Sequence, residues 1–146
     1  MNIRSIKASD SLSLSLIEKE CFSHPWSKTA LSDFFDSTLN FGLCAEEDGA
    51  LCGYVGVTFI IDEAQISNVA VGGKFRRRGI AKMLIRSLID ESVRRKMSVV
   101  TLEVRASNLP AIKLYESFGF TAVGRRKNYY TDPAEDAVLY DLKLSI

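Results

Sequence analysis

The chain has 146 residues, of which 47% are hydrophobic and 25% are charged, and its formal net charge is +1. This composition is that of one globular domain, and a nearly neutral chain has no overall field that would attract nucleic acid. No apolar run approaches the ~20 residues of a membrane span and the amino terminus lacks a signal-peptide core, so we expect a cytoplasmic protein without membrane contact.

The cysteines and the histidine give no metal-binding pattern. Cys21, Cys44 and Cys52 form no Cys-x-x-Cys motif, and His24 is the single histidine. We therefore expect no metal, and we expect each cysteine to serve as a small buried apolar group.

Hydrophobic periodicity predicts the first half of the chain in the order strand, helix, helix, strand, strand, strand. One helix is predicted from Asp10 to about Phe22, and a shorter one begins at Ser27, just after a Pro-Trp break. Strands are predicted at residues 3–6, 40–46, 51–59 and 63–71, and Glu47-Asp48-Gly49 is a strong turn signal between the second and the third.

The second half is predicted in the order helix, strand, helix, strand, strand. The first of these helices has an apolar face from Ile80 onward and ends at the cations of residues 94–96. Residues 98–104 are nearly all β-branched or apolar, which predicts a strand buried on both faces. Asn108 is predicted to cap a further helix that Gly119 ends, and Phe120 opens the last strands. The pattern predicts one α+β domain over residues 1–146, with a mixed sheet and helices on both faces.

A short basic loop at residues 76–82 separates the strand at 63–71 from the helix. Its three arginines and several backbone N–H groups meet at a helix N-terminus, which is a ready site for an anion. Gly79 and Ala81 lack bulk, so the oxygens of an anion could approach the main chain closely. The loop is not a Walker motif, because Ile80 follows Gly79, and Gly-x-Gly-x-x-Gly does not occur. Taken alone, the loop could equally be a solvated basic segment before an ordinary helix.

Three polar residues follow the loop in a suggestive order. Glu103 lies inside an apolar strand, Asn108 lies just beyond that strand, and Tyr115 lies in the next helix. Each also has a simple structural explanation: Glu103 could pair with Arg105 or another cation, Asn108 could only cap a helix, and Tyr115 could be a core aromatic residue.

Together these motifs resemble the GNAT acetyltransferase superfamily. The loop Arg76-Arg77-Arg78-Gly79-Ile80-Ala81 has the pattern of its pyrophosphate loop, Arg/Gln-x-x-Gly-x-Gly/Ala, and the stretch from Leu102 to Phe120 resembles the second half of a GNAT domain. The likeness covers essentially the whole chain and implies the GNAT fold, with a mixed, mostly antiparallel, twisted central sheet. It narrows to the bacterial enzymes that acetylate the N-terminal alanine of a ribosomal protein through three further motifs, Pro25-Trp26-Ser27, Asp62-Glu63-Ala64 and Arg125-Arg126-Lys127-Asn128-Tyr129-Tyr130.

The resemblance implies a role for each matching residue. Glu103 would be the general base and Tyr115 the general acid in acetyl transfer from acetyl-CoA, the co-substrate, to an amine. In the family Asp-Pro often follows the central strand, whereas this chain has Gly72-Gly73, which leaves the loop less preorganised. The residues expected to contact acetyl-CoA are Val69, Ala70 and Val71 along the acetyl and pantetheine arm, Arg76, Arg77, Arg78, Gly79, Ile80, Ala81 and Lys82 around the pyrophosphate, and Asn108.

The expected acceptor is the N-terminal peptide of small-subunit ribosomal protein 18, without direct nucleic-acid binding. Trp26, Tyr129 and Tyr130 would wall a cleft for this peptide, unless Trp26 simply packs the second helix onto the sheet and the tyrosines finish a strand. Acidic residues could complement basic residues after the alanine of the acceptor; these are Asp132, Glu135 and Asp136.

Three other functions remain open from the sequence. The chain could be a GNAT enzyme for another amine, such as a lysine side chain or a small metabolite. It could be a non-catalytic acetyl-CoA-binding module, or a nucleic-acid binder that uses the basic runs at residues 76–78 and 125–127.

Overall fold

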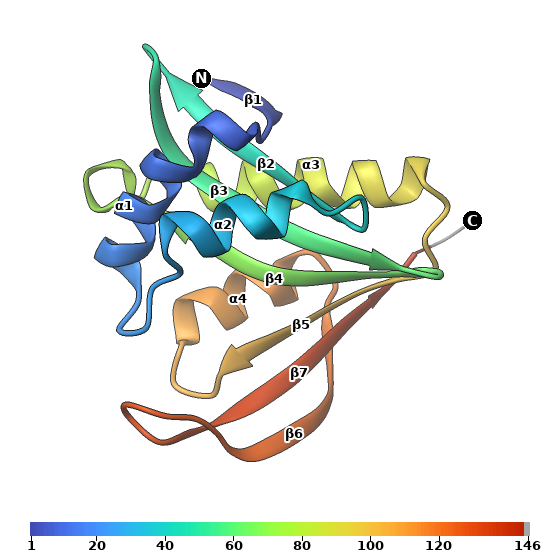
Figure 1. The fold of residues 1–146 in the computed structure, drawn as a ribbon. Helices are drawn as coiled ribbons and strands as arrows, with labels where there is room; N and C mark the ends of the chain where they lie inside the picture. Colours follow the sequence, from blue (N-terminus) through green and yellow to red (C-terminus); the bar gives the residue numbers. More distant parts are fainter. Residues whose placement is uncertain (145–146) are drawn as a thin grey trace.

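Seven strands with alternating or continuous apolar residues form one sheet, and helices cover both of its faces (Figure 1). The computed structural model describes residues 1–144. The strands are β1 (Asn2–Ser5), β2 (Asn40–Glu47), β3 (Ala50–Ile60), β4 (Glu63–Val71), β5 (Val99–Arg105), β6 (Thr121–Tyr130) and β7 (Glu135–Lys143). The helices are α1 (Ser11–Cys21), α2 (Lys28–Asp36), α3 (Ile80–Arg94) and α4 (Leu109–Ser117), with short 3₁₀ turns at Ala8–Asp10 and Gly73–Phe75.

The strand order is β1-β2-β3-β4-β5-β7-β6, and β4 and β5 form the parallel pair of an otherwise antiparallel sheet. The two parallel strands pair over only three positions, from Glu63 opposite Val99 to Gln65 opposite Thr101. Beyond Gln65 they diverge, and Figure 1 shows the ribbons separating toward the C-terminal end of β4. The predicted order of elements and the mixed, mostly antiparallel sheet are confirmed.

The alternation of side chains along the strands gives the domain two apolar cores. On one face Cys44, Tyr54 and Ala70 pack against buried residues of α1 and α2. On the other face Val55 and Val57 belong to a larger core that includes α3, Tyr115 of α4 and the buried side of β5 and β7. The sheet therefore packs against an apolar core on each face. The divergence of β4 from β5 separates strands β1 to β4 from strands β5 to β7.

Turns and caps follow the predicted residues closely. Asp48 and Gly49 have φ values of 51° and 80°, the positive angles of a two-residue hairpin turn between β2 and β3. The Ser27 hydroxyl accepts the Ala30 N–H at 3.1 Å at the start of α2, and Gly119 follows α4 with φ 97°.

One prediction about β5 is wrong. The strand is not buried on both faces: Val100, Leu102 and Val104 are buried, whereas Thr101 and Glu103 between them lie on an accessible face. The β-branched run is misleading because α1 and α2 cover β2, β3 and β4 but stop short of β5.

Candidate active site

The open edge of β4 is the centre of the site. The pairing with β3 skips Ser67, which forms a bulge between Ile66 and Asn68. Gly72 donates its N–H to the Cys52 carbonyl at 2.7 Å. Hydrogen-bonded and non-bonded pairs alternate along antiparallel strands, so Ala70 turns its main-chain groups toward β3.

By the same alternation, Val69 and Val71 turn their N–H groups away from β3. These groups point to the edge of β4 that no longer pairs with β5. Two main-chain donors thus face the gap. Of the three residues expected to line the acyl arm, Val69 and Val71 present N–H groups there, while the main chain of Ala70 is used inside the sheet.

The loop before α3 presents a run of free main-chain donors. Met83 donates its N–H to the Gly79 carbonyl at 3.1 Å, which begins the helical pattern. Among the described residues, no acceptor meets the seven N–H groups from Arg76 to Lys82. Gly79 makes the turn into the helix with φ 75°, and nothing lies within 4 Å of where its Cβ would be. The loop therefore has the geometry of an anion site at a helix N-terminus.

The cations of this loop differ in availability. Arg78 pairs with Glu47 at 2.5 Å, and Arg76 donates to the Val71 carbonyl at 3.3 Å and lies near the Cys21 sulfur. Arg77 forms no ion pair with any residue from 1 to 144, and it has a positive φ of 64°. Of the three arginines, Arg77 has the side chain that is free to meet a new anion.

Glu103 lies in a groove on the accessible face of β5. The groove has a volume of about 530 Å³ and also reaches Tyr129 and Tyr130 at the end of β6. The Glu103 side chain is 31% exposed, and Arg126 lies 3.5 Å from its carboxylate. Hydrogen bonding to Glu103 raises the pKa of the Tyr129 hydroxyl. The cation opposite Glu103 is thus Arg126, while Arg105 instead pairs with Glu135.

Tyr115 is buried at the end of α4, with 7% of its surface exposed. Burial, together with the nearby Tyr130, raises the pKa of Tyr115 to about 12. Burial, together with the nearby Glu103 charge, raises the pKa of Tyr130 to about 12. Tyr130 lines the groove together with Glu103, whereas Tyr115 lies in the core and does not line it.

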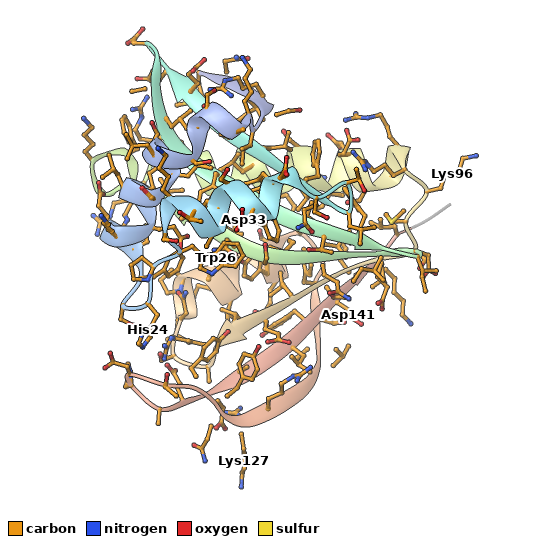
Figure 2. All side chains as sticks on the ribbon, in the orientation of Figure 1. His24, Trp26, Asp33, Lys96, Lys127 and Asp141 are labelled. Atoms are coloured by element: carbon orange, nitrogen blue, oxygen red, sulfur yellow. The ribbon has the colours of Figure 1, made fainter. Side chains whose placement is uncertain are left out.

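The remaining expected site residues are placed differently. The Asn108 side chain caps α4 by accepting the Ala111 N–H at 3.3 Å, while its amide NH₂ has no partner among residues 1–144. Trp26 packs on the core under α1 and α2, with its ring 5.1 Å from Phe34, and it does not line the groove (Figure 2). The aromatic wall of the groove therefore consists of Tyr129 and Tyr130.

The acidic residues expected to meet the acceptor are mostly engaged within the fold. Glu135 accepts the Ser107 N–H at 2.6 Å and pairs with Arg105, and Asp136 pairs with Arg125 at 2.8 Å. The hydrogen bond from the Asn128 N–H and the Arg125 guanidinium hold the pKa of Asp136 below its usual value. These contacts fix the β6–β7 turn and leave little charge for a ligand.

Two other carboxylates line the groove, and the sequence analysis missed them. Glu63 opens β4 and Asp141 lies on β7 beside Thr101. Burial and the Glu63 charge raise the pKa of Asp141. The alternation of Val138 and Tyr140 with Leu139 and Asp141 was the available signal, because it places Asp141 on the same face as Glu103.

Within the described chain no three His, Cys, Asp or Glu side chains gather closely enough to hold a metal ion. No helix of residues 1–144 combines the length and the apolar character that a membrane crossing requires.

The split sheet, the donor-rich loop and the groove that holds Glu103 are the features of an acetyl-group transferase. The chain belongs to the acetyltransferase (GNAT) family, whose sequence pattern it matches over residues 12–120. It is 38% identical over 147 residues to the ribosomal protein bS18-alanine N-acetyltransferase of Escherichia coli (strain K12), a match that covers 99% of this chain and 98% of that protein.

Two further comparisons agree. N-alpha-acetyltransferase RimI of Mycobacterium tuberculosis is 34% identical over 117 residues, which cover 77% of this chain and 72% of that protein. The crystal structure of the ribosomal-protein-S18-alanine N-acetyltransferase from Escherichia coli superposes with a TM-score of 0.93 at 33% identity, covering 99% of this chain and 94% of that one. The resemblance inferred from the motifs is confirmed.

Proposed function

We propose that the protein transfers the acetyl group of acetyl-CoA to the N-terminal alanine of small-subunit ribosomal protein 18. The observation that carries the proposal is the split between β4 and β5, which has outward-facing main-chain N–H groups on β4 and Glu103 in an open groove on β5. The name of the relative at 38% identity supports this acceptor, and the name of the relative at 34% identity supports N-terminal acetylation.

The loop before α3 and the open edge of β4 would together hold acetyl-CoA. The free N–H groups from Arg76 to Lys82, with Arg77, suit the pyrophosphate, since main-chain donors at a helix N-terminus bind phosphate oxygens. The pantetheine arm would run along the open edge of β4, where Val69 and Val71 direct their N–H groups toward the thioester carbonyl. The Asn108 amide would supply a further donor.

The chemistry requires a base and an acid. An α-amino group has a pKa of about 8, so most of it is protonated at neutral pH and cannot attack a thioester. Glu103, directly or through one water, takes the proton of the amine. The amine nitrogen then bonds to the thioester carbon, and the N–H groups of Val69 and Val71 stabilise the resulting oxyanion. As the carbon–sulfur bond breaks, the nitrogen gives up its second proton to solvent and Tyr115 gives its hydroxyl proton to the leaving thiolate. Glu103 then releases the proton it took to solvent, and Tyr115 regains one from solvent, so one proton is released overall.

The groove on β5, β6 and β7 would hold the acceptor peptide. Tyr129 and Tyr130 lie at the Glu103 end, edge to face with ring centroids 5.1 Å apart, and would wall the first residue of the peptide. The β6–β7 turn meets the α1–α2 connection through the Ser23 hydroxyl, which donates to the Asp132 carbonyl at 3.2 Å, and through His24, 3.6 Å from the Asp132 carboxylate. This bridge at the open side of the split favours a chain end as the acceptor over a residue within a chain.

Mass spectrometry of synthetic peptides incubated with enzyme and acetyl-CoA tests the proposal. We expect a peptide with a free N-terminal alanine to gain one acetyl group, and the same peptide with a blocked N-terminus and an internal lysine to gain none. Glu103→Gln should abolish transfer while leaving peptide affinity largely unchanged. Asp141→Asn, which removes a carboxylate from the same groove away from the split, is the matched control and should retain turnover. Acetylation of the internal lysine as readily as of the N-terminus would overturn the proposed acceptor.

A further inference from the structure

A carboxylate that the proposed chemistry does not use is buried beside the site. Glu18 of α1 has no exposed surface and forms no ion pair with any residue from 1 to 144. Three neutral groups donate to it instead: the main-chain N–H of Trp26 at 2.9 Å, the Tyr54 hydroxyl at 2.6 Å and the Asn68 amide at 3.2 Å. Glu18 is thus a buried carboxyl group whose described partners are all neutral hydrogen-bonding groups.

Such an arrangement needs a reason, because a buried carboxylate without a cation loses its hydration and keeps only the stabilisation that its hydrogen bonds return. A carboxylate has two acceptor oxygens and no donor, so it can satisfy three donors at once. An amide or an apolar side chain of similar size could not. Burial and the hydrogen bond to Glu18 raise the pKa of Tyr54, so this hydroxyl stays protonated and donating.

The donor Asn68 connects Glu18 to the reacting centre. Asn68 follows the bulge at Ser67 and immediately precedes Val69, whose N–H faces the split. The segment from Ile66 to Val71 has lost β5 as a neighbour, so β3 is its one remaining strand partner. A strand with one open edge needs side-chain contacts from elsewhere if its donors are to keep a fixed direction.

The last turns of α1 supply these contacts. Besides the bond from Asn68 to Glu18, the Cys21 thiol donates to the Val71 carbonyl at 3.4 Å, and the Gly73 N–H donates to the Glu20 carboxylate at 2.7 Å. Three residues between positions 68 and 73 are therefore hydrogen-bonded to α1; these are Asn68, Val71 and Gly73. Glu18 differs from Glu20 and Cys21 because it is fully buried and also holds the α1–α2 connection through Trp26.

We infer that Glu18 is a positioning residue for acetyl transfer: through Asn68 it fixes the direction of the Val69 and Val71 N–H groups that meet the thioester carbonyl. This inference rests on the proposed function, since it assigns the residue that aligns the oxyanion donors. Glu18 does not touch either substrate, and its effect is on orientation, where a displacement of about 1 Å costs on the order of a hundredfold in rate.

Glu18→Gln tests the inference, with Ser15→Ala as the matched control. Ser15 lies on the same helix and is also buried, but its hydroxyl donates to the Leu12 carbonyl and does not contact β4. We expect Glu18→Gln to lower the single-turnover transfer rate, measured with both substrates saturating, by roughly tenfold to a hundredfold. The dissociation constant for acetyl-CoA, measured by calorimetry, should stay nearly unchanged, because the loop before α3 is not altered. Ser15→Ala should change the melting temperature without changing the transfer rate.

Asn68→Ala provides a second, independent variant, since it cuts the link to β4 and leaves Glu18 with two donors. It should lower the transfer rate as Glu18→Gln does. The double variant Glu18→Gln with Asn68→Asp reverses the direction of the hydrogen bond, because the amide at residue 18 then donates to the carboxylate at residue 68. It should recover part of the transfer rate. If Glu18→Gln does not fold, Asn68→Ala decides the question alone. A folded Glu18→Gln or Asn68→Ala variant that transfers at the wild-type rate overturns the inference.

A readout without turnover separates this inference from the proposed function. In protein labelled with ¹⁵N-valine, Glu18→Gln should shift the amide resonances of Val69 and Val71, and Ser15→Ala should not. If the wild type acetylates no peptide, the proposed function fails while this measurement still reports on the alignment. If the wild type is active but the two resonances and the rate are unaffected by Glu18→Gln, the inference alone fails.

Discussion

Glu103 and Tyr115 have environments suited to opposite roles. Glu103 lies in an open groove beside Arg126, where an incoming amine can reach it. Tyr115 lies in the apolar interior, where its anionic form is disfavoured and its pKa is about 12. Tyr115 therefore carries its proton throughout the neutral range, as a general acid must.

Replacing Tyr115 with Phe removes the transferable proton and preserves the ring that packs on Phe120. We expect turnover to fall by about 10² to 10⁴, the usual contribution of a general acid, with the affinity for acetyl-CoA and the fold unchanged. Single-turnover kinetics are the appropriate measurement, because slow product release could hide the effect in kcat. Near-wild-type rates at every pH would return Tyr115 to a purely structural role.

The buried tyrosines also predict how stability depends on pH. Tyr115 and Tyr130 have folded pKa values of about 12, above the ~10 of an unfolded tyrosine, so the folded state binds more protons between these values. Their contribution is complete below about pH 10 and is lost as pH rises through about 12. Burial raises the pKa of Tyr54 as well, which adds to the same slope. Denaturant unfolding at a series of alkaline pH values should show falling stability, and Tyr115→Phe should flatten the slope.

Sequence reasoning found residues whose role depends on local pattern and missed those whose role depends on where elements meet. Glu103 was placed by strand spacing and Tyr115 by helix spacing; the structure puts Glu103 in the groove and buries Tyr115 near the end of α4. Trp26 was misplaced because an aromatic residue after a proline gives no indication of which core it enters. Glu18 went unnoticed because its three donors come from the α1–α2 connection, β3 and β4, and no local pattern relates those segments.

At the scale of elements, the loop before α3 is proposed to bind acetyl-CoA mainly through its main-chain N–H groups. Gly79→Val places a β-branched residue at φ 75°, a conformation that such residues rarely adopt, although no neighbouring atom would collide with its Cβ. We expect acetyl-CoA affinity, measured by calorimetry, to fall severely because the N–H groups of the loop lose their common direction. Arg78→Ala should weaken binding less, since Arg78 is already paired with Glu47.

Gly49→Val is the matched control for the loop prediction. Gly49 has φ 80° and equally open surroundings, but it lies in the β2–β3 turn. This variant should lose stability to a similar extent and keep its acetyl-CoA affinity. If Gly79→Val is folded and binds acetyl-CoA normally, the assignment of the phosphate loop is wrong.

The β3–β4 turn carries a strained residue. Ile61 has φ 56° and is 93% exposed, so a β-branched side chain sits in a left-handed conformation without any packing. Ile61→Gly should stabilise the fold by about 1 kcal/mol, which raises the melting temperature by about 2–4 °C in a domain of this size. Ile60→Gly, one position earlier at the end of β3, should instead be destabilising. Equal losses in the two variants would contradict this explanation.

The element order could be predicted because strand and helix periods, the Ser27 and Asn108 caps and the Asp48-Gly49 turn are local signals. The exposure of one face of β5 could not be predicted in this way, because it depends on how far α1 and α2 extend over the sheet. The bulge at Ser67 and the three-position pairing of β4 with β5 also lack a local signal, yet they create the site.

For the whole molecule, the weakest pairing in the sheet lies where the two substrates are proposed to meet. The halves on either side of the split share only three paired positions between β4 and β5, together with the shared core around α3 and α4. Bound acetyl-CoA should therefore stabilise the entire domain. At a hundred times its Kd it should add about 2.7 kcal/mol to the free energy of unfolding, seen as a rise in melting temperature. Gly79→Val, treated identically, should show a much smaller rise.

The edge strand β6 affects how readily copies of the protein could aggregate with one another. Every residue of β6 except Tyr130 is exposed, and an uncovered edge of ten residues could pair with the same edge of another copy. Arg125, Arg126 and Lys127 lie along this edge. The register with β7 shifts between Arg126 and Tyr130, and Lys127 projects outward (Figure 2). Cationic side chains and an irregular register both disfavour the pairing of two such edges. The basic run thus acts against edge-to-edge aggregation.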